Sequence, residues 1–441
     1  MKQFSLSILL LFLPMMAGAT AYDFVVDGIY YHYDSKNRTA SIASRSTSDA
    51  LFSDMQEYEG DIVIPAEVTY NGRTIPITKV ESSAFSNCTK LHSVILPNSV
   101  TSIGSGAFYK CTSLETVVLP EGLTIIEENL FIKCKSLVNV EIPSSVISFG
   151  DHAFEGCSSL KKMVMPEGLT DMGSSTFNDC TSLEEVIFSD NLIRVTGFKN
   201  CTSLKNVRLP HGNLQFVGYQ CFENCTSFTE ISLPIGVKVS EGAYKGCENV
   251  HKLIIEEPTE GYGGVTFPEY KYYFDHPFYL CSLDTIYYGA SASMTNKVNI
   301  FYNIPELKVL YCGEKALTMY RFGENIEKVY AMYQDPTVTS VPIFPDKVYV
   351  NATLYVPIGT KEKYMVAKGW EEFFNIVEID YESNASGDGT KNTSDIVKTV
   401  NSIMGKVSDG FDEKAADING DGVVNIADIV KLVNIIMGKP L

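Results

Sequence analysis

The chain has 441 residues, a formal net charge of −18 and 45% hydrophobic residues. The acidic excess is spread along the whole chain, which makes nucleic acid and anionic membranes poor candidates as partners. The eleven cysteines are an odd number, so complete internal pairing as disulfides is excluded.

Residues 1–21 have the features of a secretory signal peptide. A single lysine, Lys2, precedes an apolar run from Phe4 to Met16, and Ala19-Thr20-Ala21 offers a small-residue cleavage site. The apolar run is shorter than the ~20 residues that a membrane-spanning helix needs. We therefore expect a mature chain that begins near Tyr22 and is secreted or located at the cell surface.

Residues 22–83 are expected to form a β-rich N-terminal cap that leads into the following repeats. Alternating apolar and polar residues predict short strands, and Asp27-Gly28 and Asn71-Gly72 are typical hairpin turns. A cap of this kind covers the apolar core that the open end of a repeat array exposes.

Cysteines recur every 23 residues from residue 88 onward, with small slips near the end of the series. Each lies in the same sequence, which is cleanest as Ala107-Phe108-x-x-Cys111-x-x-Leu114-x-x-Val117-x-Leu119-Pro120. A period in the low twenties with this Leu-x-x-Val-x-Leu core predicts a leucine-rich repeat solenoid, a β-rich fold in which each coil buries its core against its neighbours. The regular repeats span residues 84–256. The series comprises Cys88, Cys111, Cys134, Cys157, Cys180, Cys201, Cys225 and Cys247.

Three local features of a coil follow from this sequence. The Leu-x-x-Val-x-Leu segment predicts a short strand that ends at the proline, because proline cannot donate to a ladder. The residue before each cysteine predicts a tight turn, since six of the eight are Asn, Asp or Gly. The aromatic residue near the start of each repeat predicts a stack of rings in the core. For the cysteines, buried packing is favoured over disulfides, and metal binding is less favoured than either.

Residues 257–381 carry fading repeats and a C-terminal cap. Leu354-Tyr355-Val356-Pro357 predicts a final strand, and Thr360 to Gly369 predicts a capping helix. An aromatic cluster from Tyr262 to Tyr279 has two interpretations that the sequence leaves open. Its rings either stack on sugar rings of a ligand or fill an irregular coil.

Residues 22–381 resemble the BspA-like leucine-rich repeat surface proteins of Bacteroidetes and related bacteria. The resemblance rests on the repeat sequence described above, on Gly60-Asp61-Ile62-Val63-Ile64-Pro65 and on Leu354-Tyr355-Val356-Pro357. It implies an extracellular, non-catalytic solenoid, and some members of the family adhere to host matrix proteins or to other cells. The resemblance assigns no binding residue, because the shared residues form the core.

Residues 417–428 have the spacing of an EF-hand calcium loop, with oxygen-bearing side chains at positions 1, 3, 5, 9 and 12. Gly422 permits the sharp bend at position 6, and three carboxylates that converge without a cation would repel one another. A turn without metal is the alternative. The predicted calcium ligands of this loop are Asp417, Asn419, Asp421, Val423 through its carbonyl group, Asn425 and Asp428.

A second, weaker loop lies 33 residues upstream, and an amphipathic helix is predicted after each loop. The upstream loop has two carboxylates where the downstream loop has three, so weaker calcium binding is expected. Its candidate ligands are Asn384, Ser386, Asp388, Thr390, Asn392 and Asp395.

The paired loops and helices of residues 383–441 resemble a type I dockerin, a small all-α calcium module. The resemblance implies a cohesin-like partner, recognised through loop positions 10 and 11, which are Thr393, Ser394, Ile426 and Ala427 in this chain. These two pairs differ in sequence, so two equivalent binding faces are not expected. Packing of Ile426 inside the module is an equal alternative.

The leading functional hypothesis is a non-catalytic binding or adhesion protein. Its solenoid would recognise an extracellular protein or glycan, and its calcium-bound tail would dock to a cohesin-type partner. The sequence contains no common catalytic motif. A carboxylate pair for glycoside hydrolysis within residues 257–381 is an alternative that the sequence leaves open, because the two carboxylates need to be close in space and not in sequence. The alternatives are a component of an extracellular polysaccharide-degrading complex and a tail that serves only as a calcium-stabilised end module.

Overall fold

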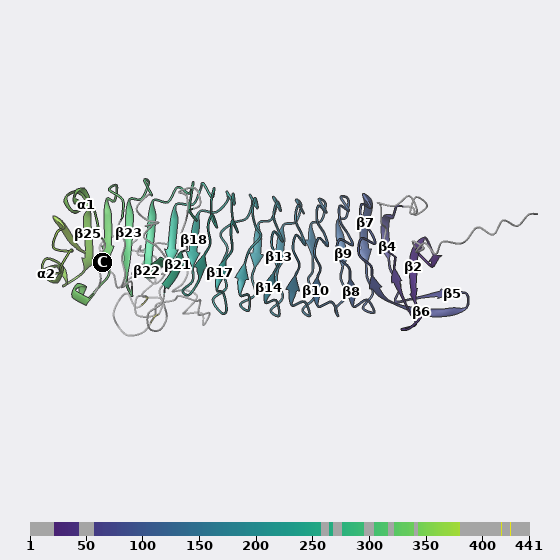
Figure 1. Ribbon diagram of the computed structural model, residues 1–441. Helices are drawn as coiled ribbons and strands as arrows, with labels where there is room; N and C mark the ends of the chain where they lie inside the picture. Colours follow the sequence, from purple (N-terminus) through teal and green to yellow (C-terminus); the bar gives the residue numbers. More distant parts are fainter. Residues whose placement is uncertain are drawn as a thin grey trace, which may run out of the picture.

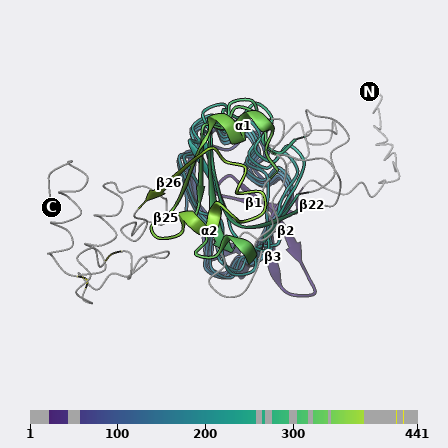
Figure 2. The same cartoon turned by 90° about the vertical axis from the view of Figure 1, so that its left-hand side faces the viewer.

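The protein is an elongated β-solenoid of about 11 turns with a spacing near 23 residues, which confirms the predicted fold of the repeats. Its coils stack along one axis, with the N-terminal strands at one end of the rod and α1 and α2 at the other (Figure 1). Seen along the axis, the coils superpose around a common interior (Figure 2). The computed structural model describes residues 22–43, 57–256, 264–267, 276–294, 304–315, 322–338 and 343–379, with the isolated residues 416 and 424.

One side of the solenoid, the first wall, is built from the Leu-x-x-Val-x-Leu segments. Where its strands pair, they pair in parallel and in register, as Val94 with Val117 in the first two regular coils. The first-wall strands are β4 (Glu59–Val63), β7 (Lys90–Ile95), β9 (Thr116–Val118), β11 (Asn139–Val140), β13 (Lys162–Val164), β15 (Glu185–Ile187), β18 (Glu230–Leu233), β20 (Lys252–Ile255), β22 (Thr285–Met294), β23 (Val309–Lys315), β24 (Lys328–Ala331), β25 (Thr353–Pro357) and β26 (Asn375–Ile379).

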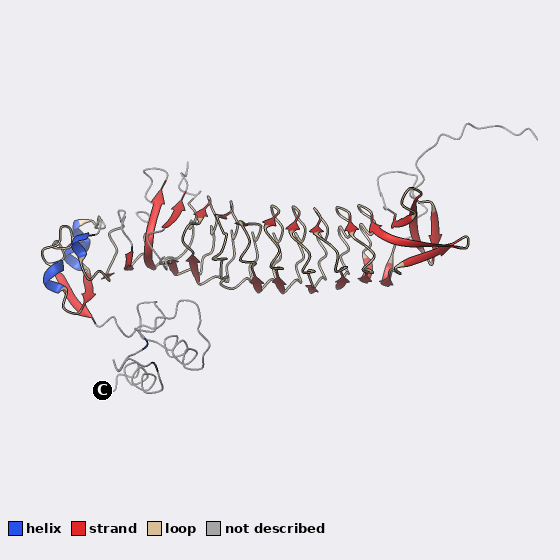
Figure 3. Ribbon diagram, turned by 90° about the horizontal axis from the view of Figure 1, so that it is seen from below, coloured by secondary structure: helices blue, strands red, loops and turns tan. Residues whose placement is uncertain are grey.

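A second row of short parallel strands forms the second wall, which the sequence did not predict as strands (Figure 3). Each two-residue strand of this wall buries one residue, such as Ile126 in β10 and Phe149 in β12, and exposes or half-buries its neighbour. The second-wall strands are β6 (Arg73–Val80), β8 (Ser102–Ile103), β10 (Ile125–Ile126), β12 (Ser148–Phe149), β14 (Asp171–Met172), β16 (Arg194–Val195), β17 (Phe216–Val217), β19 (Lys238–Val239) and β21 (Gly264–Phe267).

The N-terminal cap extends the second wall by three strands. β3 (Thr39–Ile42) pairs in parallel with β6, and β2 (Ile29–Asp34) and β1 (Phe24–Val26) follow as an antiparallel meander. Both predicted hairpin turns are confirmed. Asp27 and Gly28 join β1 to β2 with φ angles of 50° and 78°, and Asn71 and Gly72 join β5 (Glu67–Tyr70) to β6 with 49° and 75°.

The turn before each cysteine is confirmed in all eight repeats. The preceding residue has a φ between 56° and 74°, and these residues are Asn87, Lys110, Lys133, Gly156, Asp179, Asn200, Asn224 and Gly246. Two of them are lysines, which seldom adopt this conformation, so neighbouring coils hold the turn in place. The Lys110 N–H donates to the Ile132 carbonyl of the next coil at 2.8 Å, and other coils repeat this bond.

The predicted stack of aromatic rings is also confirmed. Neighbouring rings lie 5.1 to 5.5 Å apart with interplanar angles of 1° to 19°. The stack runs without interruption through the regular coils and is almost completely shielded from solvent. Its members are Phe85, Phe108, Phe131, Phe154, Phe177, Phe198, Phe222 and Tyr244.

The cysteines of the repeats are buried, as predicted, and their thiols also make a directional contact. The thiol of Cys157 donates to the Phe131 carbonyl of the preceding coil at 3.1 Å, and seven other cysteines repeat the contact at 3.0 to 3.3 Å. Cysteine therefore combines a small apolar volume with a weak donor that links coils.

Two features of the C-terminal coils differ from expectation. The repeat sequence fades after residue 256, yet β22 and β23 there are the longest strands of the first wall, with ten and seven residues, because Thr285 to Tyr288 and similar segments are rich in β-branched and aromatic residues. The prediction that Leu354 to Pro357 is the last strand is wrong. After the short helix α2 (Lys361–Tyr364), β26 adds one more strand, since Ile376 pairs with Leu354 and continues the apolar core.

Two other short helical segments accompany these C-terminal coils. They are the 3-10 helix η3 (Pro336–Val338) and α1 (Asp346–Asn351). Trp370 is fully buried beside Tyr364 of α2, with ring centroids 5.6 Å apart. The end of the solenoid is therefore closed by aromatic packing as well as by β26.

Candidate ligand-binding face

The outward surface of the first wall between Lys90 and Ile255, termed the strand face below, presents the exposed side chains of successive coils. Successive side chains of a strand point to opposite faces, so Val117 of β9 is buried while Thr116 and Val118 are exposed. Because the strands are in register, equivalent outward residues of successive coils form rows along the rod.

Four of the five first-wall strands from β7 to β15 have an exposed apolar residue at or next to their last outward position, and these residues form a row. Ile95, Val118, Val164 and Ile187 occupy this position, with between 43% and 52% of each residue exposed. Glu141 interrupts the row in one coil. The sequence analysis missed this row, although the third variable position of Leu-x-x-Val-x-Leu is Val or Ile in four repeats. Aligned apolar side chains on an open face are typical of an interaction surface.

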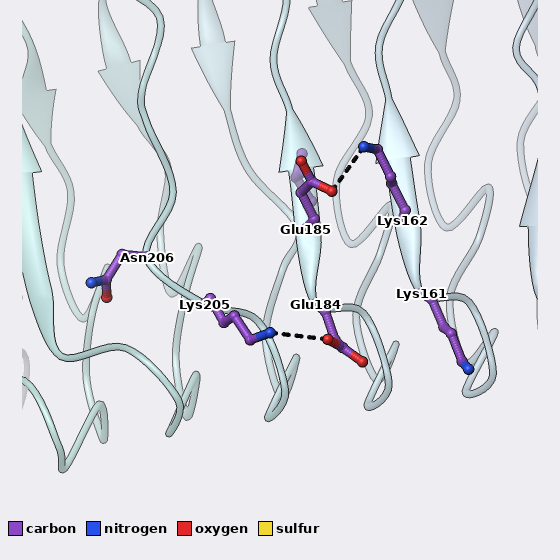
Figure 4. Close-up of a pocket in the computed structure, with 7 residues that line it drawn as sticks. Lys161, Lys162, Glu184, Glu185, Lys205 and Asn206 are labelled. Atoms are coloured by element: carbon purple, nitrogen blue, oxygen red, sulfur yellow. Dashed lines mark hydrogen bonds and ion pairs between the residues drawn. The ribbon is translucent and has the colours of Figure 1, made fainter. Parts of the chain in front are cut away.

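Opposite charges alternate from coil to coil beside the apolar row (Figure 4). Lys162 contacts Glu185 at 2.8 Å, and Lys205 contacts Glu184 at 3.1 Å. Each of these side chains is about half exposed or more, so the pairs contribute little to stability. They do present a fixed pattern of both charges around a shallow groove of about 390 Å³.

The strand face continues as a row of tyrosines in the C-terminal coils. Tyr311 stacks on Tyr330 at 4.3 Å, and Tyr330 stacks on Tyr355 at 4.6 Å, with ring planes within 13° of parallel. Burial, followed by the charge of Tyr355, raises the pKa of Tyr330. Since the ring faces of this row are used by neighbouring tyrosines, Tyr330 has no ring face left for a sugar.

The sequence-predicted calcium and cohesin sites lie outside the described residues. This applies to both calcium loops, at residues 384–395 and 417–428 apart from the non-ligand Val424, and to Thr393, Ser394, Ile426 and Ala427. Of the aromatic cluster, Phe267, Phe278 and Tyr279 are described, and Phe267 is buried with its ring 6.0 Å from that of Phe278. Phe278 is also buried and stacks on Tyr244 at 5.9 Å, which supports the core-filling interpretation for these two rings.

Within the described part of the chain, no group of three or more His, Cys, Asp or Glu side chains is arranged to hold a metal ion. No helix in those same segments combines the length and apolar character that crossing a membrane requires.

Comparison with known proteins identifies the class to which this solenoid belongs. Residues 78–197 and 192–308 match the family described as BspA type leucine rich repeat region, and together they cover just over half of the chain. The chain therefore belongs to the BspA-type leucine-rich repeat family. A comparison with curated proteins gives no match.

Several solved structures are similar to this chain. A leucine-rich repeat protein from Bacteroides ovatus is 21% identical over 81% of this chain and 100% of that chain, with a TM-score of 0.48. The T. pallidum leucine-rich repeat protein is 26% identical over 52% of this chain and 90% of its own, with a TM-score of 0.37. A leucine-rich cell surface protein from Faecalibacterium prausnitzii is 18% identical over 80% of this chain and 94% of its own, with a TM-score of 0.39.

Proposed function

We propose that this protein is a secreted or cell-surface binding protein whose strand face recognises an extracellular protein. The observation that carries the proposal is the exposed row of Val and Ile beside alternating Lys and Glu. Aliphatic side chains with a rim of both charges suit a protein surface, which offers complementary apolar and ionic groups. Family membership and the cell-surface description of the F. prausnitzii protein support an extracellular location.

A protein ligand is favoured over a glycan by the composition of the strand face. The outward strand positions from Lys90 to Ile255 carry no Phe, Tyr or Trp, so this face has no aromatic platform. The full-length chain should bind a panel of immobilised extracellular matrix proteins more tightly than a panel of polysaccharides. Saturable binding to polysaccharides alone would favour the alternative hypothesis, in which the protein is a component of a polysaccharide-degrading complex.

The C-terminal module is proposed to bind calcium and to dock to a cohesin-like protein. The support is the spacing of oxygen ligands from Asp417 to Asp428 and the resemblance of residues 383–441 to a dockerin. The full-length chain should capture a secreted partner in calcium and release it on chelation. The double variant Asp417→Asn and Asp421→Asn should lose this capture, whereas Asp409→Asn, outside the loops, should retain it. Capture that is unaffected by chelator would contradict the docking proposal.

A further inference from the structure

The first wall of the solenoid ends in an open strand edge at β4. Among the described strands, β4 pairs with β7 alone, while the second wall is continued beyond β6 by β3, β2 and β1. The cap therefore closes one wall and leaves the edge of the other without a strand neighbour in the described structure. Ile62, whose equivalents in later coils are buried, is only partly buried at this end.

The register shows which backbone groups face the open side. The Ile64 N–H donates to the Ile95 carbonyl at 2.9 Å, and the Leu96 N–H donates to the Val118 carbonyl at 3.1 Å. In each of these two coils, the residue at this position, Ile95 or Val118, thus directs its carbonyl group toward the preceding coil. Val63 occupies the same position in β4, which has no preceding coil. Its N–H and C=O therefore point away from β7, toward the open side of the edge. Asp61, two residues earlier, points the same way.

A cleft of about 730 Å³ runs beside this edge, between β4, the β1–β2 turn and β5. Its lining contains carboxylates and no lysine or arginine, and the carboxylates are Asp27, Glu57, Glu59, Asp61 and Glu67. Three of these carboxylates have local partners, since the Thr89 hydroxyl donates to Glu57 at 2.9 Å, the Ser93 hydroxyl donates to Asp61 at 2.6 Å and Lys90 lies 3.6 Å from Glu59. Among these partners only Lys90 is charged, so the lining stays acidic. Ile62, Val63 and Val68 add apolar surface.

We propose that this edge binds an extended segment of a protein partner in which Lys or Arg alternates with apolar residues. The segment would add to β4 as a further strand and take its main-chain hydrogen bonds from Asp61 and Val63. Alternate side chains of a strand point to opposite faces, so the apolar ones would meet Ile62 and the basic ones would meet the carboxylates. This site is separate from the strand face and from the C-terminal module.

The test uses a labelled peptide, Thr-Lys-Val-Lys-Val-Lys-Thr, and the full-length chain, with binding followed by fluorescence anisotropy. Val63→Pro removes one outward N–H and blocks strand addition, and proline is tolerated where the N–H of an edge strand faces solvent. We expect this variant to bind the peptide about tenfold or more weakly, with an unchanged circular dichroism spectrum.

Charge and backbone pairing are separated by further variants and probes. Asp27→Asn with Glu67→Gln should weaken binding about fivefold, whereas Glu121→Gln with Glu167→Gln, which removes the same charge elsewhere, should leave it unchanged. A peptide with N-methylated valines, or with Glu in place of Lys, should fail to bind. The proposal is overturned if wild-type chain does not bind the basic peptide saturably. Equal binding of the N-methylated peptide, or equal loss in the two charge variants, would also overturn it.

Discussion

The coils of residues 84–256 and those of residues 283–379 bury similar apolar interiors but are joined by different contacts. In the regular coils, β9 to β16 are only two or three residues long, and continuous ladders of rings and thiols connect neighbours. In the C-terminal coils, β22 to β26 have four to ten residues each, and tyrosines stack on the outward side of the strands, where Tyr311 is buried and Tyr330 and Tyr355 are partly buried. Short strands therefore require a repeated core sequence, whereas long strands let the core sequence vary.

The largest expected effect is a loss of stability at alkaline pH that starts in the regular coils. Burial raises the pKa of Cys247 to about 12 and raises that of Cys180 and Cys201 as well. Unfolded thiols ionise near pH 8.5, so stability is full below that pH and declines as pH rises toward 12. At pH 10 each such thiol should lower the free energy of unfolding by about 2 kcal/mol.

Urea unfolding at pH 7.5 and pH 10, with pulsed thiol labelling and mass spectrometry, measures this loss coil by coil. Burial also raises the pKa of Cys312, but nine of the eleven cysteines lie in residues 84–256, so the summed loss is larger there. We therefore expect Cys180 and Cys201 to be labelled before Cys312 of the C-terminal coils at pH 10. The same urea midpoint at both pH values would show that the thiols are not buried as described.

Removal of one ring from the core stack should have the next largest effect. Phe154 lies 5.2 Å from Phe131 and 5.2 Å from Phe177 and is fully buried, so Phe154→Ala should cost about 3 to 5 kcal/mol. Tyr330→Ala removes a half-buried ring from the outer row and should cost about 1 kcal/mol. Urea denaturation of both variants by circular dichroism compares them, and equal losses would contradict the distinction between the two regions.

Removal of a thiol should have an intermediate effect on stability, and its size should depend on whether the new side chain can still donate a hydrogen bond. Cys157→Ala loses the contact with the Phe131 carbonyl and some core volume. It should lower the free energy of unfolding by about 1 to 2 kcal/mol. Cys157→Ser retains a donor of similar size and should recover part of this loss. If serine is worse than alanine, the thiol acts only as an apolar group.

The smallest expected effect concerns the ion pairs of the strand face. Lys162→Ala should change the free energy of unfolding by about 0.5 kcal/mol or less, because both partners are about half exposed. Thermal unfolding of this variant at low and high salt provides the measurement. A loss of several kcal/mol would mean that these charges maintain the fold rather than meet a ligand.

The sequence predicted the solenoid, the turns and the ring stack because these depend on residues that recur at fixed spacing. It did not predict the second wall, whose strands of about two residues carry little periodic signal, such as Ser148 and Phe149 in β12. The apolar row was missed because Val118 and Ile187 look like core residues until the register places them outside. The open edge of β4 depends on which strands pair, and that is a property of the assembled fold.

The claim that the strand face binds the ligand is tested most directly by placing charge on the apolar row. We expect Val164→Asp with Ile187→Asp to reduce binding of the full-length chain to its matrix-protein ligand about tenfold or more at an unchanged melting temperature. Ile147→Asp with Ile193→Asp changes two exposed residues beside second-wall strands and should leave binding intact. Undiminished binding by the first double variant, or an equal loss in both, would contradict the account.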